Sequence, residues 1–282
     1  MSTIEVTSPF DDKVVGTVPF SNVEEVKAAI ELANDTFHDH KNALPKYKRI
    51  EILEKVAEIM SSQIEELTIL CASEGGKPYM DSKVEIQRAI NGVKLSIEAL
   101  SSFEGTEIAM GHTASSANRM AYTFKEPIGV VAAVSAFNHP FNLAIHQVIP
   151  AIAVGCSVII KPATQTPMSA VKLIEILAEA GLPKGWAQAV VCGREAGELL
   201  ATSPKINFLT FACLAILPIS EGGMCNERPA PFCDSGIALC AINISVPLAK
   251  LAKVWKRLLI SPEKVIAQPA TSIRQAKAGI GP

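Results

Sequence analysis

Hydrophobic and polar positions between residues 128 and 167 predict a strand, a loop, a helix and a second strand. The apolar run 130–134 leads into the loop 135–140. A helical pattern follows and ends at Gly155, and a second apolar run ends at Lys161. Unbroken apolar runs of this length are typical of strands buried on both faces. Because ligands bind where the strands of such sheets end, we expect a binding site at these two strand exits.

The first 127 residues predict mostly helices, each with hydrophobic positions at helical spacing. Ser21 and Glu24 form the expected capping box of the first helix, and Pro45 opens the second. The last and longest of these helices is expected to bury Val84. The expected elements are strands at residues 3–7 and 13–18, helices at 21–37, 45–60, 62–72 and 81–103, and a strand at 118–124.

After residue 167 helices and strands alternate, with a helix at 168–180, a strand at 187–191, a helix at 193–202 and a strand at 206–211. This alternation predicts an α/β fold, a Rossmann-like parallel sheet with flanking helices and right-handed connections. The regularity stops after Phe211. A helical stripe returns within residues 247–267, with lysines and arginines mostly off the apolar positions. It is consistent with a membrane-surface helix, a partner-binding helix or a chance packing helix.

The composition of the chain excludes several classes of protein. Its 282 residues allow one large domain or two ordinary ones, and a hydrophobic fraction of 49% is ample for a core. No apolar run reaches the ~18 residues that a membrane span needs, and the first residues lack the apolar region of a signal peptide. A net charge of −2 argues against a nucleic-acid partner. Seven cysteines without metal-type spacing favour a reducing compartment and predict a cytoplasmic protein without a metal site.

Charge and cysteine content change abruptly near residue 212. Residues 1–211 contain 18 Lys+Arg and 24 Asp+Glu, whereas residues 212–282 contain 8 and 4. The second segment also holds four of the seven cysteines. We therefore expect two regions, 1–211 and an irregular tail, 212–282, which a frameshift, a mis-spliced exon or a fusion would explain.

Six motifs in the first region, taken together and in this order, resemble the N-terminal part of the NAD(P)-dependent aldehyde dehydrogenase family. The resemblance covers roughly residues 10 to 211. The motifs are Arg49-x-x-x-Leu53-x-x-x-Ala57-x-Ile59; Glu74-Gly75-Gly76-Lys77-Pro78 with Glu85 downstream; Glu126-Pro127-Ile128-Gly129-Val130-Val131; Ala136-Phe137-Asn138-His139-Pro140; Gly155-x-x-Val158-x-Ile160-Lys161-Pro162-x-x-x-Thr166-Pro167; and Gly193-x-x-x-Gly197.

The resemblance implies a role for Asn138 as the amide donor that stabilises the oxyanion formed when a thiol attacks an aldehyde. Without the resemblance, Asn138 reads as an ordinary turn residue. It also implies that Lys161 binds the adenosine ribose of NAD or NADP, where a solvated strand-end lysine is the alternative. The implied cofactor-binding residues are Ser135, Ala136, Phe137, Lys161, Ala163, Thr164, Gly193 and Gly197.

Thr164 bears on the choice of cofactor. Many NAD-preferring relatives carry a glutamate at this position, where it accepts hydrogen bonds from the ribose. Because a carboxylate would repel a 2′-phosphate, its absence predicts that NADP is tolerated or preferred.

The catalytic cysteine and glutamate of the family have no identifiable positions in this chain. Glu221-Gly222-Gly223 follows Phe211 too soon to be the family's glutamate segment. The nearby cysteines, Cys225, Cys233 and Cys240, lack a preceding Gly-Gln. Since hydride transfer in this family requires a cysteine adduct of the aldehyde, we expect a truncated form that is inactive alone.

Three functional hypotheses follow. The first is the cofactor half of an enzyme that oxidises a small-molecule aldehyde to a carboxylate. The second is a non-catalytic dinucleotide-binding or subunit-pairing protein, because residues 104–127 resemble the hairpin through which the family forms homo-oligomers. The third is an unstable product, since half a cofactor sheet would leave apolar surface exposed.

Overall fold

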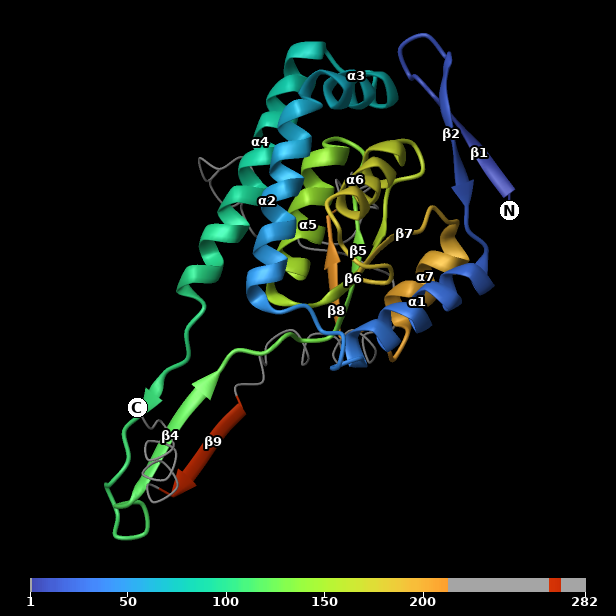
Figure 1. Cartoon of the computed structure of the whole chain (residues 1–282). Helices are drawn as coiled ribbons and strands as arrows, with labels where there is room; N and C mark the ends of the chain where they lie inside the picture. Colours follow the sequence, from blue (N-terminus) through green and yellow to red (C-terminus); the bar gives the residue numbers. More distant parts are fainter. Residues whose placement is uncertain (1, 213–263, 270–282) are drawn as a thin grey trace, which may run out of the picture.

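The computed structural model describes residues 2–212 and 264–269 (Figure 1). A parallel sheet lies between two layers of helices, and a long hairpin extends away from this body. The elements are β1 (Ser2–Thr7), β2 (Val14–Phe20), α1 (Val23–His38), α2 (Lys46–Ser62), α3 (Ile64–Gly75), α4 (Tyr79–Ala99), a 3₁₀ turn (Leu100–Ser102), β3 (Glu107–Ile108), β4 (Arg119–Phe124), β5 (Val130–Val134), α5 (Pro140–Val154), β6 (Ser157–Lys161), α6 (Met168–Glu179), β7 (Ala187–Ala189), α7 (Arg194–Thr202), β8 (Phe208–Phe211) and β9 (Lys264–Pro269).

The central sheet has the strand order β7-β6-β5-β8, and all neighbouring strands are parallel. From β5 the chain moves outward through β6 to β7, then returns to place β8 on the other side of β5. The direction of winding therefore reverses beside β5. Crevices at such a reversal are the usual ligand sites of open α/β sheets, so the topology puts the loop after β5 in that position.

Alternate residues of β5 and β6 enter different cores, which explains why both strands are apolar throughout. Val131 and Ala133 pack with α2 to α6, whereas Val130 and Ala132 pack with α1 and α7. Both faces are thus shielded from water, as a parallel sheet requires. The predicted α/β class with a Rossmann-like parallel sheet and flanking helices is confirmed.

The β1–β2 hairpin lies at the β7 side of the sheet. Val6 and Val18 pack there against Val191 in a small third core. The backbone of Ser21 continues this contact by donating to the carbonyl of Val191 at 2.7 Å. This role of Ser21 explains why the predicted Ser21–Glu24 capping box is wrong.

The capping box of α1 is instead formed one residue later. The Asn22 side chain accepts from the backbone N–H of Glu25, and the Glu25 carboxylate accepts from the N–H of Asn22, both at 2.9 Å. Asn is as good an N-cap as Ser, and Glu occupies the third helical position in either register. The local pattern therefore allowed both registers, and the contact of Ser21 with the sheet selected one.

Helices α2, α3 and α4 belong to the layer that covers the Val131 and Ala133 face of the sheet. The prediction that Val84 is buried is wrong, because its side chain is 41% exposed, while Ser82, Glu85 and Ile86 face inward. Arg49, the first residue of the first motif, is half-buried. It donates to the carbonyl of Ala153 at 2.9 Å and to that of Leu44, so it caps the last turn of α5.

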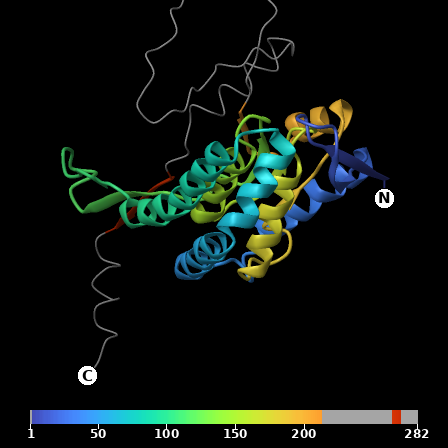
Figure 2. The same ribbon diagram turned by 90° about the horizontal axis from the view of Figure 1, so that it is seen from above.

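Strand β4 lies at the centre of a three-stranded antiparallel sheet, β3-β4-β9, that projects from the body (Figures 1 and 2). The expected helical stripe at 247–267 is contradicted at its end, where residues 264–267 belong to the strand β9. The edge of β4 offers six consecutive backbone pairing positions to β9. Such a ladder overrides a weak helical pattern. The rest of the stripe lies outside the described residues.

The strand expected at 130–134 matches β5 at both ends, and the other expected strands begin or end one to two residues away from the observed ones, which is the usual spread at element ends. For example, the strand expected at 187–191 is observed as Ala187–Ala189, and the strand expected at 206–211 as Phe208–Phe211. Among the described residues, no helix combines the length and the hydrophobicity that crossing a membrane requires.

Candidate functional site

Two loops leave adjacent strands at the carboxyl edge of the sheet and lie in direct contact. The backbone N–H of Ser135, after β5, donates to the carbonyl of Lys161 at the end of β6, over 2.9 Å. The hydroxyl of Thr166 donates to the carbonyl of Phe137 over 3.4 Å. The structure thus brings the predicted residues 135–138 and 161–164 side by side, and we call these two segments the two walls of the candidate site.

Lys161 is held beside α7 rather than extended into solvent. A Cβ atom placed on Gly197 would lie 3.0 Å from Cε of Lys161, so a larger residue at 197 would displace the side chain. Within the described part of the chain, the ammonium has one hydrogen bond, a long one of 3.5 Å to the carbonyl of Pro162. A cation with so few partners can bind an acceptor group of a ligand.

Cys192 is the buried neighbour of this ammonium. Burial raises the pKa of the Cys192 thiol, and the charge of Lys161 partly offsets that effect. The thiol is therefore neutral at physiological pH and packs as a small hydrophobic side chain.

The remaining residues predicted on this side differ in position. Ala163 is half-buried and Thr164 is exposed on the loop after β6. Gly193 caps the start of α7 with extended backbone, φ −72° and ψ −175°, which any residue adopts. The nearest atom to a Cβ at Gly193 lies 3.7 Å away, on Phe20. An added Cβ atom at Gly197 would therefore press on Lys161, whereas one at Gly193 would meet only ordinary contact distances.

Asn138 occupies the other wall and is half-buried. Its backbone carbonyl accepts a hydrogen bond from Nζ of Lys77 at 3.1 Å. Its side-chain amide has no hydrogen bond within residues 2–212 and 264–269, so the amide donor is available. Phe137 beside it is 46% exposed, whereas Ser135 and Ala136 are buried.

Glu85 fixes the start of α5 directly after this wall. Its carboxylate, only 1% exposed, accepts from the backbone N–H groups of Phe141 at 3.0 Å and Asn142 at 3.1 Å. It also binds Nζ of Lys77 and lies 3.2 Å from Nδ1 of His139. Burial disfavours the charged form, but these hydrogen bonds and the Lys77 charge outweigh it and lower the pKa of Glu85 to about 2. Glu85 is therefore ionised at neutral pH.

Glu74 holds the start of α6 in the same way. Its carboxylate accepts from the N–H of Met168 at 2.8 Å and of Ser169 at 3.0 Å, and binds the Ser169 hydroxyl as well. Here burial dominates and raises the pKa of Glu74, against the effect of these hydrogen bonds. Cys71 lies in the same region, and burial together with the charge of Glu85 raises the pKa of its thiol to about 12. Burial therefore keeps both this thiol and that of Cys192 in the neutral form at physiological pH.

Gln147 makes a link between strand ends that the sequence reasoning missed. It lies on α5 with 7% of its surface exposed. Its amide Nε2 donates to the carbonyl of Val134 at 3.0 Å and to Thr210 at 3.4 Å, and so joins the carboxyl ends of β5 and β8. An amide at an inward position of an otherwise apolar helix was the signal that could have identified it.

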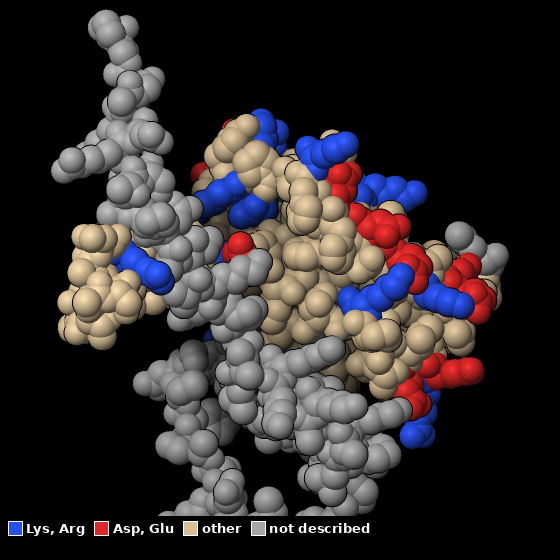
Figure 3. Space-filling model, turned by 90° about the horizontal axis from the view of Figure 1, so that it is seen from below, with Lys and Arg blue, Asp and Glu red and all other residues tan. Residues whose placement is uncertain are grey.

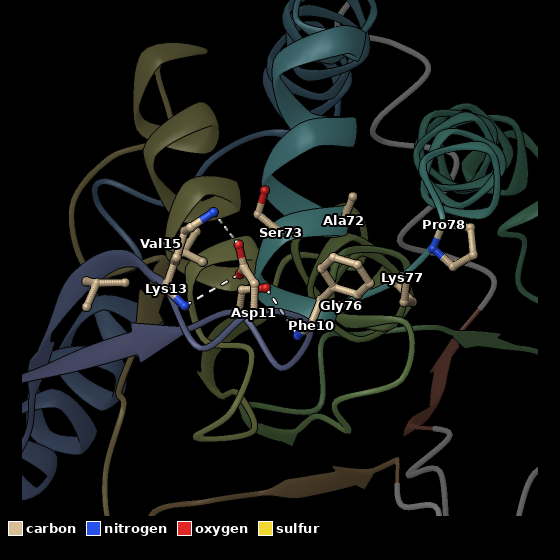
Figure 4. A pocket seen from close by; sticks show the side chains of 11 residues that line it. Phe10, Asp11, Lys13, Val15, Ala72, Ser73, Gly76, Lys77 and Pro78 are labelled. Atoms are coloured by element: carbon tan, nitrogen blue, oxygen red, sulfur yellow. Dashed lines mark hydrogen bonds and ion pairs between the residues drawn. The ribbon is translucent and has the colours of Figure 1, made fainter.

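A surface hollow lies apart from these strand ends. It is formed where the β1–β2 turn meets the junction of α3 and α4, and its walls include Phe10, Asp11, Lys13 and Lys77 (Figure 4). It contains no predicted site residue. On the face shown in Figure 3, positive and negative side chains are intermingled around an uncharged centre, without a continuous field of one sign.

The residues at the strand ends fit a dinucleotide. Among the described residues, Ser135 Oγ is buried without a hydrogen-bond partner, and the Lys161 ammonium has one long hydrogen bond while its side chain packs against Gly197. Polar groups that lack protein partners at one sheet edge suit a polar ligand. No cluster of three or more metal-ligating side chains occurs in the described ranges.

Comparison with known proteins supports this assignment. The model of the Aldehyde dehydrogenase family matches residues 1–213. The chain is 37% identical to the 3-sulfolactaldehyde dehydrogenase of Priestia aryabhattai over 209 residues, which cover 74% of this chain and 43% of that protein. It is 34% identical to the lactaldehyde dehydrogenase of Methanococcus maripaludis, covering 74% and 44%.

Solved structures agree. Aldehyde dehydrogenase 21 from Physcomitrella patens, in complex with the reaction product succinate, has a TM-score of 0.71 at 32% identity, covering 74% of this chain and 44% of that one. The NADP-dependent glyceraldehyde-3-phosphate dehydrogenase from Bacillus halodurans C-125, complexed with NADP, has a TM-score of 0.70 at 31% identity, with the same coverage.

The match ends where the sequence pattern predicted. It extends to residue 213, two residues beyond the predicted end of the resemblance, and the chain spans less than half the length of the curated relatives it matches. The shared region contains both walls of the site. By its family match, its sheet topology and the placement of its motifs, this chain belongs to the aldehyde dehydrogenase family.

Proposed function

We propose that residues 1–211 are the cofactor-binding half of an NAD(P)-dependent aldehyde dehydrogenase and that the 282-residue chain does not oxidise aldehydes alone. The observation that carries this proposal is the contact between the two walls, with Ser135 bonded to Lys161 and Lys161 packed against Gly197. Among the described residues, this arrangement places an amide without a side-chain hydrogen bond and an ammonium with one long hydrogen bond at the same sheet edge. NAD or NADP, when bound, would supply the hydride acceptor.

Each residue has a defined part in this proposal. Lys161 binds the adenosine ribose, and Gly197 lets the dinucleotide approach α7. Asn138 donates its side-chain amide to the oxygen of an aldehyde under attack, a contribution worth about 10²–10³ in rate in other enzymes. The attacking cysteine has no assigned position in this sequence.

We also propose that NADP binds at least as well as NAD. Thr164 is exposed on the wall that carries Lys161 and has no negative charge. A 2′-phosphate on the adenosine ribose would therefore meet an ammonium and no carboxylate. The relative from Bacillus halodurans that is complexed with NADP is consistent with this choice.

Titration of the purified chain with NADH and NADPH, followed by nucleotide fluorescence, tests both points. We expect saturable binding of both nucleotides, and Lys161→Ala should weaken it at least about tenfold, the equivalent of one charge-assisted hydrogen bond. Thr164→Glu should weaken the binding of NADPH more than the binding of NADH. Lys172→Ala is a suitable control, because Lys172 is a lysine of α6 that pairs with Glu66 at the surface.

Two results would contradict the proposal. If the folded wild type binds neither nucleotide, the cofactor role fails. If NADH binds tightly and NADPH not at all, the preference is wrong while the site stands.

A subunit-pairing role is the second candidate. The β3–β4 hairpin extends far from the body (Figure 1), as expected of an element that contacts another subunit. We propose a homo-oligomer in the cytoplasm. The three described cysteines, Cys71, Cys156 and Cys192, are free thiols, which suits a reducing compartment. Light scattering of the purified chain tests the oligomeric state.

A further inference from the structure

Two buried carboxylates lie eleven residues apart around the α3–α4 junction, and each holds the helix that follows one wall of the site. The Glu74 carboxylate binds the first backbone N–H groups of α6, which follows the wall that contains Lys161. The Glu85 carboxylate binds the first free backbone N–H groups of α5, which follows the wall that contains Asn138. Neither carboxylate belongs to a wall itself. The segment from Glu74 to Glu85 therefore contacts both walls from behind.

Glu85 restrains the Asn138 wall at two places, the start of α5 and, through Lys77, the backbone of Asn138. One oxygen accepts the two N–H groups that begin α5, and the other binds Lys77. Lys77 in turn donates to the backbone carbonyl of Asn138 itself, at 3.1 Å. An ionised carboxylate and an ammonium, both largely buried, thus define where the Asn138 backbone lies.

The contacts of Glu74 restrain the other wall at its far end. The carboxylate, 1% exposed, satisfies both N–H groups at the start of α6 and the hydroxyl of Ser169. Thr166, two residues before Met168, is the residue that bonds to Phe137 across the site. A displacement of the start of α6 would therefore alter the spacing between the walls.

We propose that Glu74 and Glu85, with Lys77 between them, are positioning residues, each of which sets mainly one of the two walls of the dinucleotide site. Glu74 sets the wall with Lys161, and Glu85, through Lys77, sets the wall with Asn138. The expected effect on nucleotide binding rests on the proposed cofactor function, whereas the expected effect on the position of the two loops does not.

The substitutions Glu74→Gln and Glu85→Gln separate positioning from simple stabilisation. Glutamine keeps the side-chain volume and one acceptor, but it turns the second acceptor into a donor that faces other donors. At Glu85 the new amide faces the Lys77 ammonium, and at Glu74 it faces the start of α6. The matched control is Glu66→Gln. Glu66 also lies on α3 and contacts α6 through Lys172 at 2.8 Å, but it is 61% exposed.

Amide hydrogen exchange measured by mass spectrometry on the full chain reads out each wall. We expect Glu85→Gln to accelerate exchange about tenfold in peptides covering residues 135–142, and Glu74→Gln to do so in residues 161–169. Peptides from β5 and β6 should change less than twofold, and Glu66→Gln should change neither wall. In parallel, Glu74→Gln should raise the Kd for ADP-ribose about tenfold, and Glu85→Gln should raise it less than twofold.

Acceleration in both walls and in the strands alike would overturn the proposal, because it would show a global loss of stability. Rates no different from those of Glu66→Gln would also overturn it. If Glu85→Gln does not fold, Lys77→Met tests the same wall, with faster exchange at residues 138–142 expected. If the wild type does not bind ADP-ribose, the cofactor role fails, but the exchange measurements still decide the positioning role.

Discussion

Gly129 shows how one residue of the third motif supports the sheet. Its φ is +131°, and a Cβ atom there would lie 2.2 Å from Oδ1 of Asn207. That oxygen accepts the N–H of Val130, while the N–H of Asn207 donates to the carbonyl of Val130 at 2.9 Å. Asn207 thus clamps the beginning of β5 next to β8. A side chain at position 129 would break this clamp as well as strain the backbone.

We expect Gly129→Ala to reduce the free energy of unfolding by about 2–4 kcal/mol, through strain and overpacking together. Urea denaturation of the purified variant measures this difference. Gly181→Ala is the control, since Gly181 also has a positive φ, +98°, but no atom within 4 Å of the added Cβ. The control should lose only about 1–2 kcal/mol. Equal losses in the two variants would show that the Asn207 contact is unimportant.

At the scale of elements, the start of α5 depends on a charged carboxylate and so on pH. The folded pKa of Glu85, about 2, lies below its ordinary value of 4.5. The stabilisation by Glu85 is therefore fully present above pH 4.5 and is lost as the pH falls from 4.5 towards 2. Its upper limit is about 3 kcal/mol. Glu74, whose pKa is raised, acts in the opposite sense: its ionisation above pH 4.5 lowers stability.

Urea unfolding, measured at pH values about one unit apart between 6 and 3, checks the direction of this pH dependence. We expect wild type to be more stable than Glu85→Gln at pH 6, and the difference to shrink as the pH falls below 4.5, because only the wild type can lose the charge. A difference between the two proteins that stays constant over this range would contradict the assigned pKa.

At the scale of the whole molecule, the described residues offer no ionised thiol to the candidate site. Cys71 and Cys156 are buried, and burial raises the pKa of both thiols, as it does for Cys192. The remaining cysteines lie outside the described residues, and none follows a Gly-Gln. We therefore expect no NAD(P)H formation from propanal by the 282-residue chain.

Absorbance at the wavelength of the reduced nucleotide measures that reaction, and enzyme-free mixtures provide its baseline. Turnover abolished by substitution of Cys225, Cys233 or Cys240 would overturn the expectation. The origin of residues 212–282 stays a prediction. Translation of the nucleotide sequence after the Phe211 codon in all frames tests it, since family motifs in another frame would identify a frameshift.

The local sequence determined the elements and the class of fold. The apolar runs of β5 and β6 and the glycine at position 155 mark strands and a helix end without reference to the rest of the chain. The motifs placed Asn138 and Lys161 at strand exits, where the structure finds them. These features could be predicted because hydrophobic period and backbone preference are properties of short segments.

Only the tertiary structure decided what touches the site. The capping register of α1, the inward turn of Glu85 instead of Val84, and the link from Gln147 to β8 all depend on contacts between distant segments. The pairing of β9 with β4 depends on such contacts as well. A local pattern allows several nearly equal arrangements, and the burial of charges and backbone groups against remote partners selects one of them. For this reason the two walls could be predicted from the sequence, but the carboxylates behind them could not.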